Sequence, residues 1–342
     1  MSRLTCALGP DAAGTMLMRG LRGARHTVDA AIYEVGPSYR WALVRAIERG
    51  VAVRLVLDAH RSDGNEATAR ALIGAGAQCR VAGVGADAAH GKLLIVDGSV
   101  SVGTGNLIWR DAPRDRHLRF PPAGDPLAGT REWWVSARHS NHLRAAAAAA
   151  FHRHWTGATP PPASWAGAPE VGTPGVGTPA TQVAPAAFCI PSRRMRLVIG
   201  GAAVADTLGT GITGARRRIL VTVPYARPAS APVRALLDRM IEAASRGIAC
   251  ALLLGGVPDK PDASLLAALP FAVRSMDPTR STSGHAKGLV ADGSVIVSSA
   301  NWSGAGLGGN WEAALHIDHA GAAAYYAAAW RRDWETGHPI EV

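Results

Sequence analysis

Apolar residues fall in short runs that alternate with amphipathic stretches. In the first half of the chain, residues 23–33 begin with basic residues and continue as an apolar run rich in β-branched side chains, and residues 52–57 form a second apolar run. The stretch between them has helical character and ends at Arg49-Gly50. This order of strand, helix and strand predicts an α/β unit with a crossover connection.

The same pattern returns in the second half. Residues 214–225 match residues 23–33 in kind, and residues 249–254 match residues 52–57. A helical stretch again lies between the two runs and ends at Arg246-Gly247. Because a duplication constrains the whole architecture, the pattern predicts two similar α/β domains.

A stretch of different composition separates the repeats. Residues 156–191 are dense in Pro, Gly, Ala and Thr, which cannot build a core and are typical of a linker. A nucleotide-binding loop is the alternative, but the prolines and the lack of a flanking strand oppose it. We therefore expect a first domain over residues 1–155, closed by an alanine-rich helix near residues 143–155, and a second domain over residues 192–342.

One short motif occurs once in each half. It consists of a histidine, a lysine two residues later and an aspartate five residues after the lysine. Its members are His90, Lys92 and Asp97 in the first half and His285, Lys287 and Asp292 in the second. Side chains two apart in a strand point to the same face, so each histidine and lysine should project together. Asp-Gly then makes a tight turn, and the returning strand leads to an asparagine 16 residues after each histidine, Asn106 and Asn301.

Coincidence does not account for the two copies. The chain has three lysines against 33 arginines and 12 histidines. Chance would place a histidine two residues before two of the three lysines with odds of roughly 0.004. A single pair could be a packed histidine beside a lysine that extends to solvent, but two pairs in matching context favour chemistry. The charge of lysine is also compact, whereas that of arginine is spread over a planar guanidinium, so a chain rich in arginine can keep lysine where a point charge is wanted.

Paired motifs of this form, each followed by the asparagine, resemble the phospholipase D superfamily. Residues 297–303 and 310–312 are similar to its bacterial two-domain members in particular. The resemblance implies two similar α/β sandwich domains related by pseudo-two-fold symmetry, with the active site at their interface. It also implies a phosphodiesterase that needs no cofactor and no metal, and no cluster with metal-ligand spacing is evident beside the motifs.

The resemblance implies a division of labour between the histidines. His90 would attack phosphorus and form a phosphohistidine, and His285 would protonate the leaving group, although the symmetry leaves this order open. The two lysines and two asparagines would hold the non-bridging oxygens. An acidic residue downstream of each motif is expected to orient the imidazole: Glu312 in the second half and Glu132 in the first. Glu132 could instead be an ordinary carboxylate at a strand edge.

Other candidate residues depart from the family pattern. Thr104 in the first half, and Ser298 and Ser299 in the second, stand where the family has Gly-Ser, and their hydroxyls could donate to phosphate. A longer spacing before Glu132 makes room for a basic loop over residues 109–119. Its Arg114, Arg116 and Arg119 could grip an anionic substrate or could simply be solvated. Asp97 and Asp292 belong to the motif, but their part could be limited to the hairpins.

Charge and composition narrow the range of possible substrates and partners. The net charge of +10 and pI near 10.2 favour an anionic substrate, with nucleic acid first and a phospholipid or a small phosphodiester or phosphoramidate second. A catalytically silent nucleic-acid-binding protein is the alternative of a different class, against which two intact motifs argue. The chain shows no apolar run of eighteen residues, no signal-peptide pattern and only four scattered cysteines, so we expect a cytoplasmic protein. With both motifs in one chain, we expect a monomer with no stable partner protein.

Overall fold

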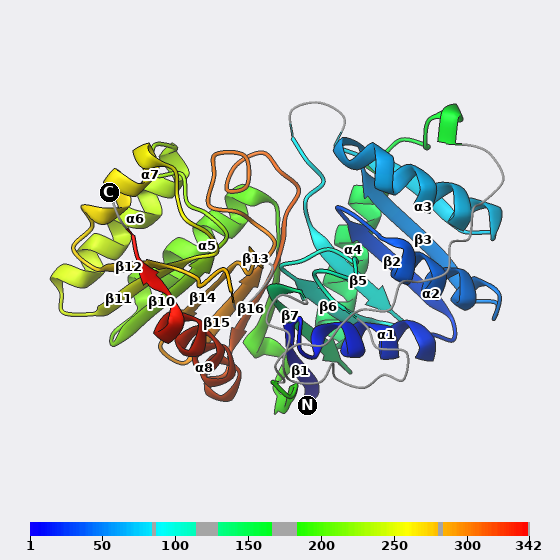
Figure 1. Cartoon of the computed structure of the whole chain (residues 1–342). Helices are drawn as coiled ribbons and strands as arrows, with labels where there is room; N and C mark the ends of the chain where they lie inside the picture. Colours follow the sequence, from blue (N-terminus) through cyan, green and yellow to red (C-terminus); the bar gives the residue numbers. More distant parts are fainter. Residues whose placement is uncertain (84–86, 114–128, 166–182, 280–282, 341–342) are drawn as a thin grey trace.

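The computed structural model describes residues 1–83, 87–113, 129–165, 183–279 and 283–340. The chain forms two α/β halves, each built on one mixed sheet, which lie side by side (Figure 1). The predicted fold class, two similar α/β domains, is confirmed.

The first sheet has the strand order β4-β3-β2-β5-β6-β7-β1-β8. Its strands are β1 (Ser2–Gly9), β2 (Thr27–Ile32), β3 (Ala52–Asp58), β4 (Gln78–Ala82), β5 (Lys92–Val96), β6 (Ser99–Gly103), β7 (Thr130–Arg138) and β8 (Ala186–Ile190). The helices are α1 (Ala13–Gly23), α2 (Pro37–Ile47), α3 (Ser62–Gly74) and α4 (Asn141–Gly157), with short 3₁₀ helices at Ala59–Arg61 and Ala163–Trp165. Strands β2, β3 and β4 are parallel and are joined through α2 and α3, as the strand–helix–strand pattern predicts.

The second sheet repeats this order as β17-β12-β11-β10-β14-β15-β16-β9. Its strands are β9 (Met195–Ile199), β10 (Arg218–Val223), β11 (Ala249–Leu254), β12 (Ala272–Ser275), β14 (Gly288–Ala291), β15 (Ser294–Ser298), β16 (Ala313–Asp318) and β17 (His338–Pro339). The helices are α5 (Gly201–Gly214), α6 (Ala231–Ser245), α7 (Lys260–Ala267) and α8 (Ala320–Thr336), with a 3₁₀ helix at Ser192–Arg194. Strands β9 to β12 and β14 to β16 therefore take the places of β1 to β7.

A hydrophobic core common to both halves holds the molecule together. Trp133 and Phe151 of the first half share one buried cluster with Leu315, Tyr326 and Trp330 of the second. The Tyr326 hydroxyl of α8 also donates to a backbone carbonyl of β7 at 2.5 Å. Each sheet has a separate core on its other face, under its own helices. Because apolar burial crosses the junction, the relative position of the two halves is part of the fold.

A short strand joins the two sheets directly. β13 (Ser283–Gly284) pairs in parallel with the start of β7, and the backbone N–H of His285 donates to the carbonyl of Arg131 at 3.0 Å. The guanidinium of Arg131 bridges Asp11 of the first half at 2.8 Å and Asp333 of α8 at 3.0 Å. The second motif therefore begins against a strand of the first half.

The segment predicted to be a linker, residues 156–191, contains more structure than its composition indicates. Residues 186–190 form β8, which pairs antiparallel with β1 and so belongs to the first sheet. Without β8, the N–H and C=O groups on that edge of β1 would need other partners. The sequence did not predict this strand, because its five residues, Ala-Ala-Phe-Cys-Ile, are surrounded by prolines and alanines. Residues 166–182 lie outside the described residues.

Candidate active site

The two motifs meet at the junction of the halves. Lys92 opens β5, and Lys287 directly precedes β14, which occupies the matching place in the second sheet. The Lys287 Nζ lies 3.3 Å from the carbonyl oxygen of Thr104 in the first half. Both lysines are buried, and each Nζ donates at 2.5 Å to the backbone carbonyl of the histidine two residues earlier. Each histidine and lysine therefore lie together, but the histidines precede β5 and β14 and do not lie in the strands where the alternation placed them.

Each histidine is oriented by a glutamate from the opposite half. The Nδ1 of His90 lies 3.0 and 3.2 Å from the two carboxylate oxygens of Glu312, and the Nδ1 of His285 lies 2.7 Å from Oε1 of Glu132. An Nδ1–H that donates to a carboxylate leaves Nε2 as the atom available for chemistry. The sequence pointed to both glutamates, but nothing in it indicated that each glutamate would orient the histidine of the other half.

Hydroxyl groups hold the two glutamates in place. The Oγ1 of Thr104 donates to Glu132 and accepts the N–H of the residue after that glutamate at 2.9 Å. The Oγ of Ser299 does the same for Glu312, with an N–H at 2.9 Å. The Oγ of Ser298 accepts a backbone N–H at 3.0 Å. These hydroxyls, which we expected to donate to phosphate, position the carboxylates and the loop.

A glycine makes the approach of Glu132 possible. Gly105 lies between Thr104 and Asn106, and a Cβ built on it would come within 2.6 Å of the carboxyl carbon of Glu132. Any side chain there would push the glutamate away from His285. The glycine of this loop therefore serves the carboxylate that the loop encloses.

The motif aspartates lie at the far end of the strands. Asp97 accepts three backbone N–H groups from residues 25–27 at 2.8 to 2.9 Å, and Asp292 accepts three from residues 216–218 at 2.7 to 3.0 Å. Asp97 follows Lys92 by five residues, about 16 Å along a strand. Both aspartates have positive φ, 48° and 50°, at the Asp-Gly turns. The structure thus separates them from the histidines, and each ties its Asp-Gly turn to the start of the neighbouring strand, β2 or β10.

The two asparagines carry unused hydrogen-bonding capacity. The amide oxygens of Asn106 and Asn301 are buried, and neither has a hydrogen-bond partner in the described part of the chain. Buried amides are normally satisfied, so a site that a polar ligand completes accounts for both. That these amides hold a phosphoryl group stays a prediction.

Burial changes the protonation of every charged group here. It lowers the pKa of His90 to about 4, with the Lys92 ammonium acting in the same direction. It also lowers the pKa of Lys92 to about 7 and that of Lys287 to about 8, and it raises the pKa of Glu132 to about 7. For Glu312, burial alone would raise the pKa, but His90, Lys92 and the Ser299 hydroxyl outweigh it and lower the value. The pKa of His285 is also lowered, first by burial and then by the Lys287 ammonium, so Lys92, Lys287 and Glu132 are the groups of the site whose pKa values lie nearest neutral pH.

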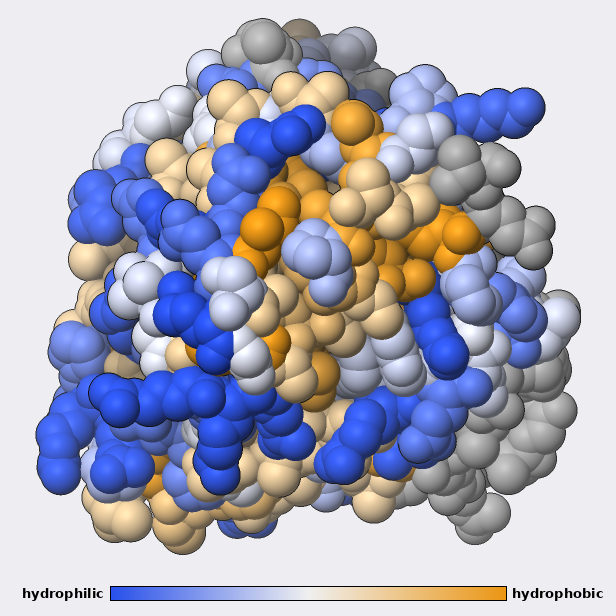
Figure 2. Space-filling model, turned by 90° about the vertical axis from the view of Figure 1, so that its left-hand side faces the viewer, coloured by the Kyte–Doolittle hydropathy of each residue, from blue (hydrophilic) through white to orange (hydrophobic). Residues whose placement is uncertain are grey.

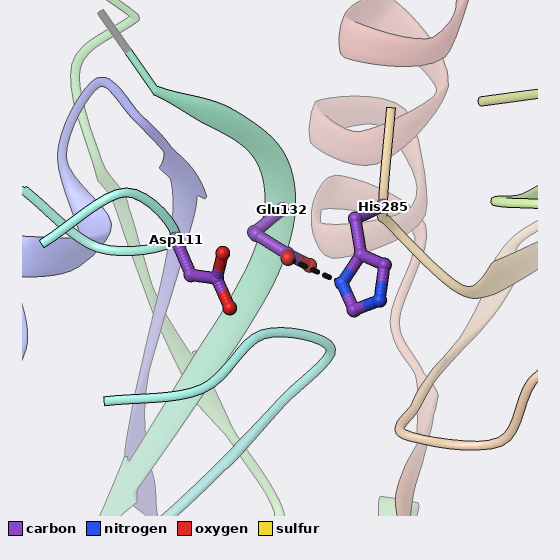
Figure 3. Close-up of side chains that lie close together, drawn as sticks. All are labelled: Asp111, Glu132 and His285. Carbon is purple, nitrogen blue, oxygen red and sulfur yellow. Dashed lines mark hydrogen bonds and ion pairs between the residues drawn. The ribbon is translucent and has the colours of Figure 1, made fainter. Parts of the chain in front are cut away.

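A third carboxylate, which sequence reasoning missed, lies beside the second histidine. Asp111 is only 5% exposed, and its carboxylate points toward Glu132 and His285 (Figure 3). One ligand atom from each of the three residues lies within 4.8 Å of the others, a spacing that could suit a cation. However, Glu132 already bonds His285, and the Lys287 ammonium lies 2.8 Å from the imidazole. The protein's own cations therefore offset these carboxylates.

The basic loop is only partly described. Arg114, Arg116 and Arg119 lie outside the described residues, so their predicted contact with substrate stays a prediction. Trp109, three residues after Asn106, is 49% exposed.

The fold and the site together define a two-domain protein with one shared two-histidine centre. The family described as "Cardiolipin synthase, PLD-like domain" matches residues 17–116 and 208–334, which cover both motifs. The chain belongs to the phospholipase D superfamily. A comparison with curated protein sequences finds no match.

Solved structures agree with the fold over nearly the whole chain. Phosphatidylserine synthase from Haemophilus influenzae is 12% identical, with a TM-score of 0.68, 98% of this chain and 87% of that chain covered. Polyphosphate kinase from Porphyromonas gingivalis is 14% identical, with a TM-score of 0.60 and 97% of this chain covered. The alignment with that kinase covers half of the kinase chain. At these identities the likeness establishes the two-domain fold.

Proposed function

We propose that this protein is a phosphodiesterase that works through a phosphohistidine, with nucleic acid as the preferred substrate. The observation that carries the proposal is the pair of imidazoles, each held at Nδ1 by a buried glutamate of the opposite half. With Nδ1 held in this way, Nε2 is the ring nitrogen left for substrate, although at His285 it also lies 2.9 Å from the Lys287 Nζ, and two such groups in one site supply a nucleophile and an acid.

The reaction proceeds in two displacements. The Nε2 of His90 attacks phosphorus, the P–N bond forms, and the bond from phosphorus to the leaving oxygen breaks. That oxygen takes a proton from the Nε2 of His285. Water, or an acceptor alcohol, then gives its proton back to His285 and attacks the phosphohistidine, which frees His90. The ammonium groups of Lys92 and Lys287 stabilise the charge on the non-bridging oxygens during both steps.

Charge favours nucleic acid among the possible substrates. The chain carries a net charge of +10, and polyanions concentrate near such a surface. Nucleic acid presents the phosphodiester that the two histidines would cleave, within a long anionic chain that the surplus positive charge can follow.

One assay tests the reaction and the substrate together. Wild-type protein and His90→Ala are incubated in EDTA with labelled single-stranded DNA, double-stranded DNA, RNA and phosphatidylcholine vesicles. We expect nucleic-acid cleavage by the wild type alone, unaffected by the chelator because protein cations balance the carboxylates. Quenching in alkaline denaturant, which preserves the acid-labile P–N bond, and peptide mapping at alkaline pH should place the phosphoryl label on His90. Two results would contradict the mechanism. One is turnover that requires added Mg²⁺ or Zn²⁺, and the other is the absence of label from every histidine.

Phosphatidyl transfer is the second candidate. The matching family is described as cardiolipin synthase-like, and one structural neighbour is a phosphatidylserine synthase. The outer end of the second half also shows apolar side chains gathered in the middle of the face and bordered by polar ones (Figure 2). In the second half, Val257 is 80% and Leu265 41% exposed, side chains that could rest on a lipid surface. No helix within the described ranges is long and apolar enough to cross a membrane. Phosphatidic acid release from the vesicles in the same assay would favour this candidate.

A further inference from the structure

The pseudo-symmetry of the site breaks at one residue. Asp111 lies five residues after Asn106, and its Oδ2 accepts the backbone N–H of that asparagine at 2.8 Å. Five residues after Asn301 the second half has Gly306, where a Cβ would come within 2.4 Å of the Asn301 carbonyl oxygen. The second half therefore has no space for a matching carboxylate. Among the described residues of the site, His285 has two carboxylates nearby, whereas the ring of His90 bonds one.

The charged groups around this carboxylate come from both halves. Glu132, His285 and Lys287 act on Asp111, and Lys92 and Arg110 also act on His285. Burial, and next the charge of Glu132, raise the pKa of Asp111. Burial and then Lys287 lower the pKa of His285, and Asp111 acts in the opposite direction. Two close, buried carboxylates repel each other, and a proton held among these groups relieves that repulsion.

The pKa shifts on the two sides of the site run in opposite directions for the carboxylates. On the His90 side, the pKa of the imidazole is about 4 and that of Glu312 is lowered, so at neutral pH the imidazole is neutral, the carboxylate is charged, and the pair holds no transferable proton. On the other side, the pKa of Glu132 is about 7 and that of Asp111 is raised, so the cluster retains one. The hydrogen bond between Glu132 and His285 lets this proton be shared, and the titration belongs to the cluster as a whole.

We propose that Asp111 assigns the two histidines their roles. As a second buried carboxylate beside His285, it keeps the transferable proton on that side of the cleft, so that His285 protonates the leaving oxygen and His90, left neutral, attacks phosphorus. Asp111 is a positioning residue, because it acts through His285 and Glu132 and does not touch the phosphate. The inference rests on the proposed phosphodiesterase function and gives a structural reason for the order of the two histidines.

The proton transfers of the two displacements follow from this difference between the two sides of the site. An anionic phosphodiester entering the cleft strengthens the hold of His285 on the shared proton. When the leaving oxygen develops negative charge, the Nε2–H of His285 passes its proton to that oxygen, and Nδ1–H stays bonded to Glu132. In the second displacement the same Nε2 removes a proton from water. The cluster returns to its starting charge, and no other reactant is needed.

Asp111→Asn tests this role, since an asparagine oxygen can still accept the N–H of Asn106. The first displacement is followed by rapid quench from pH 5 to 9 with two substrates, one that releases p-nitrophenolate and one that releases an alkoxide from a dinucleotide. With the alkoxide substrate, we expect the alkaline limb of the curve of rate against pH to shift to lower pH by about one unit. This shift lowers the rate at pH 8 about tenfold. With p-nitrophenolate, which needs little protonation, we expect a change of less than about twofold. Asp29→Asn, which changes a carboxylate paired with Arg54, is the matched control.

Two results would overturn the proposal. One is an alkaline limb that stays in place; the other is an equal loss with both leaving groups at every pH, which a merely structural role would produce. If Asp111→Asn does not fold, Asp111→Ser gives the same comparison. The Asp111 effect is also measured without turnover, by NMR titration of ¹³C-labelled histidine. The midpoint of His285 should fall in the variant by more than that of His90, and equal shifts would refute it. Failure of wild-type turnover would instead refute the proposed function.

Discussion

At the residue scale, partners decide what each ionisable group does. Glu132 and Glu312 are both fully buried, yet the pKa of one is raised to about 7 and that of the other is lowered. At Glu132, burial prevails over Lys287, the Thr104 hydroxyl and Lys92, whereas at Glu312 the charges of His90 and Lys92 and the Ser299 hydroxyl outweigh burial. Identical side chains at equivalent positions therefore differ in pKa, and this difference makes a nearly symmetric site asymmetric.

The contact between Glu312 and His90 makes a testable case. In Glu312→Gln, the amide keeps one acceptor oxygen in place of the two of the carboxylate and has no negative charge to stabilise a positive imidazole. We expect kcat to fall by roughly 10²- to 10⁴-fold, because the nucleophile loses its orientation and its counter-charge. Steady-state kinetics with circular dichroism measures this. Glu335→Gln, at the exposed end of α8, should keep full activity, and near-normal kcat in Glu312→Gln would mean that the contact is dispensable.

At the element scale, sequence patterns predicted the features that depend on residues close together in the chain. The strand–helix–strand units, the Asp-Gly turns and the pairing of each histidine with its lysine follow from periodicity within ten or twenty residues. The exchange of Glu132 and Glu312 depends on how two sheets meet, which no local pattern encodes. Asp111 was missed for the same reason, because nothing in its loop sequence shows that it faces His285. Strand β8 was missed because prolines surround it.

The hairpin aspartates make a second testable case. Asp292→Asn replaces a carboxylate that accepts three backbone N–H groups, and its pKa is lowered: burial opposes this, but those N–H groups prevail. We expect the free energy of unfolding to drop by about 1 kcal/mol, a modest figure because solvent reaches the site. A lowered folded-state pKa means that the stabilisation is present above about pH 4 and is lost as the pH falls through the folded value.

Urea unfolding at pH 6 and pH 3 measures this effect. The difference between wild type and Asp292→Asn should shrink at the lower pH, while kcat stays within about twofold of wild type. Asp206→Asn, on the exposed face of α5, is the control and should leave stability unchanged. A large loss of kcat with unchanged stability would return Asp292 to the catalytic group.

At the scale of the whole molecule, the halves form one body. The shared core, the β13–β7 pairing and the bridge from Arg131 to Asp11 and Asp333 all cross the junction. A site that requires groups from both halves within 3 Å needs such a junction, since small displacements between catalytic groups cost rate. The surplus positive charge also belongs to this scale, because long substrates respond to the summed field.

The basic loop makes a third testable case, on nucleic-acid binding. Replacing Arg114, Arg116 and Arg119 with serine should flatten the dependence of log K on log salt, by about 0.7 to 0.9 for each phosphate that the loop no longer neutralises. Fluorescence anisotropy with His90→Ala protein and labelled DNA over a range of NaCl measures the slope. The control triple variant at Arg22, Arg45 and Arg246 removes the same charge from other exposed sites. Equal slopes in the two variants would show that the loop does not contact the phosphates.

The exchanged glutamates also bear on how the two copies of the repeat can change over time. A duplicated domain usually leaves one copy free to drift while the other keeps the original task. Here a substitution of Glu132 damages the histidine of the second copy, and a substitution of Glu312 damages that of the first. Selection on either copy is therefore selection on both. This mutual dependence is reason enough for each half of the chain to retain its own histidine, lysine, asparagine and glutamate.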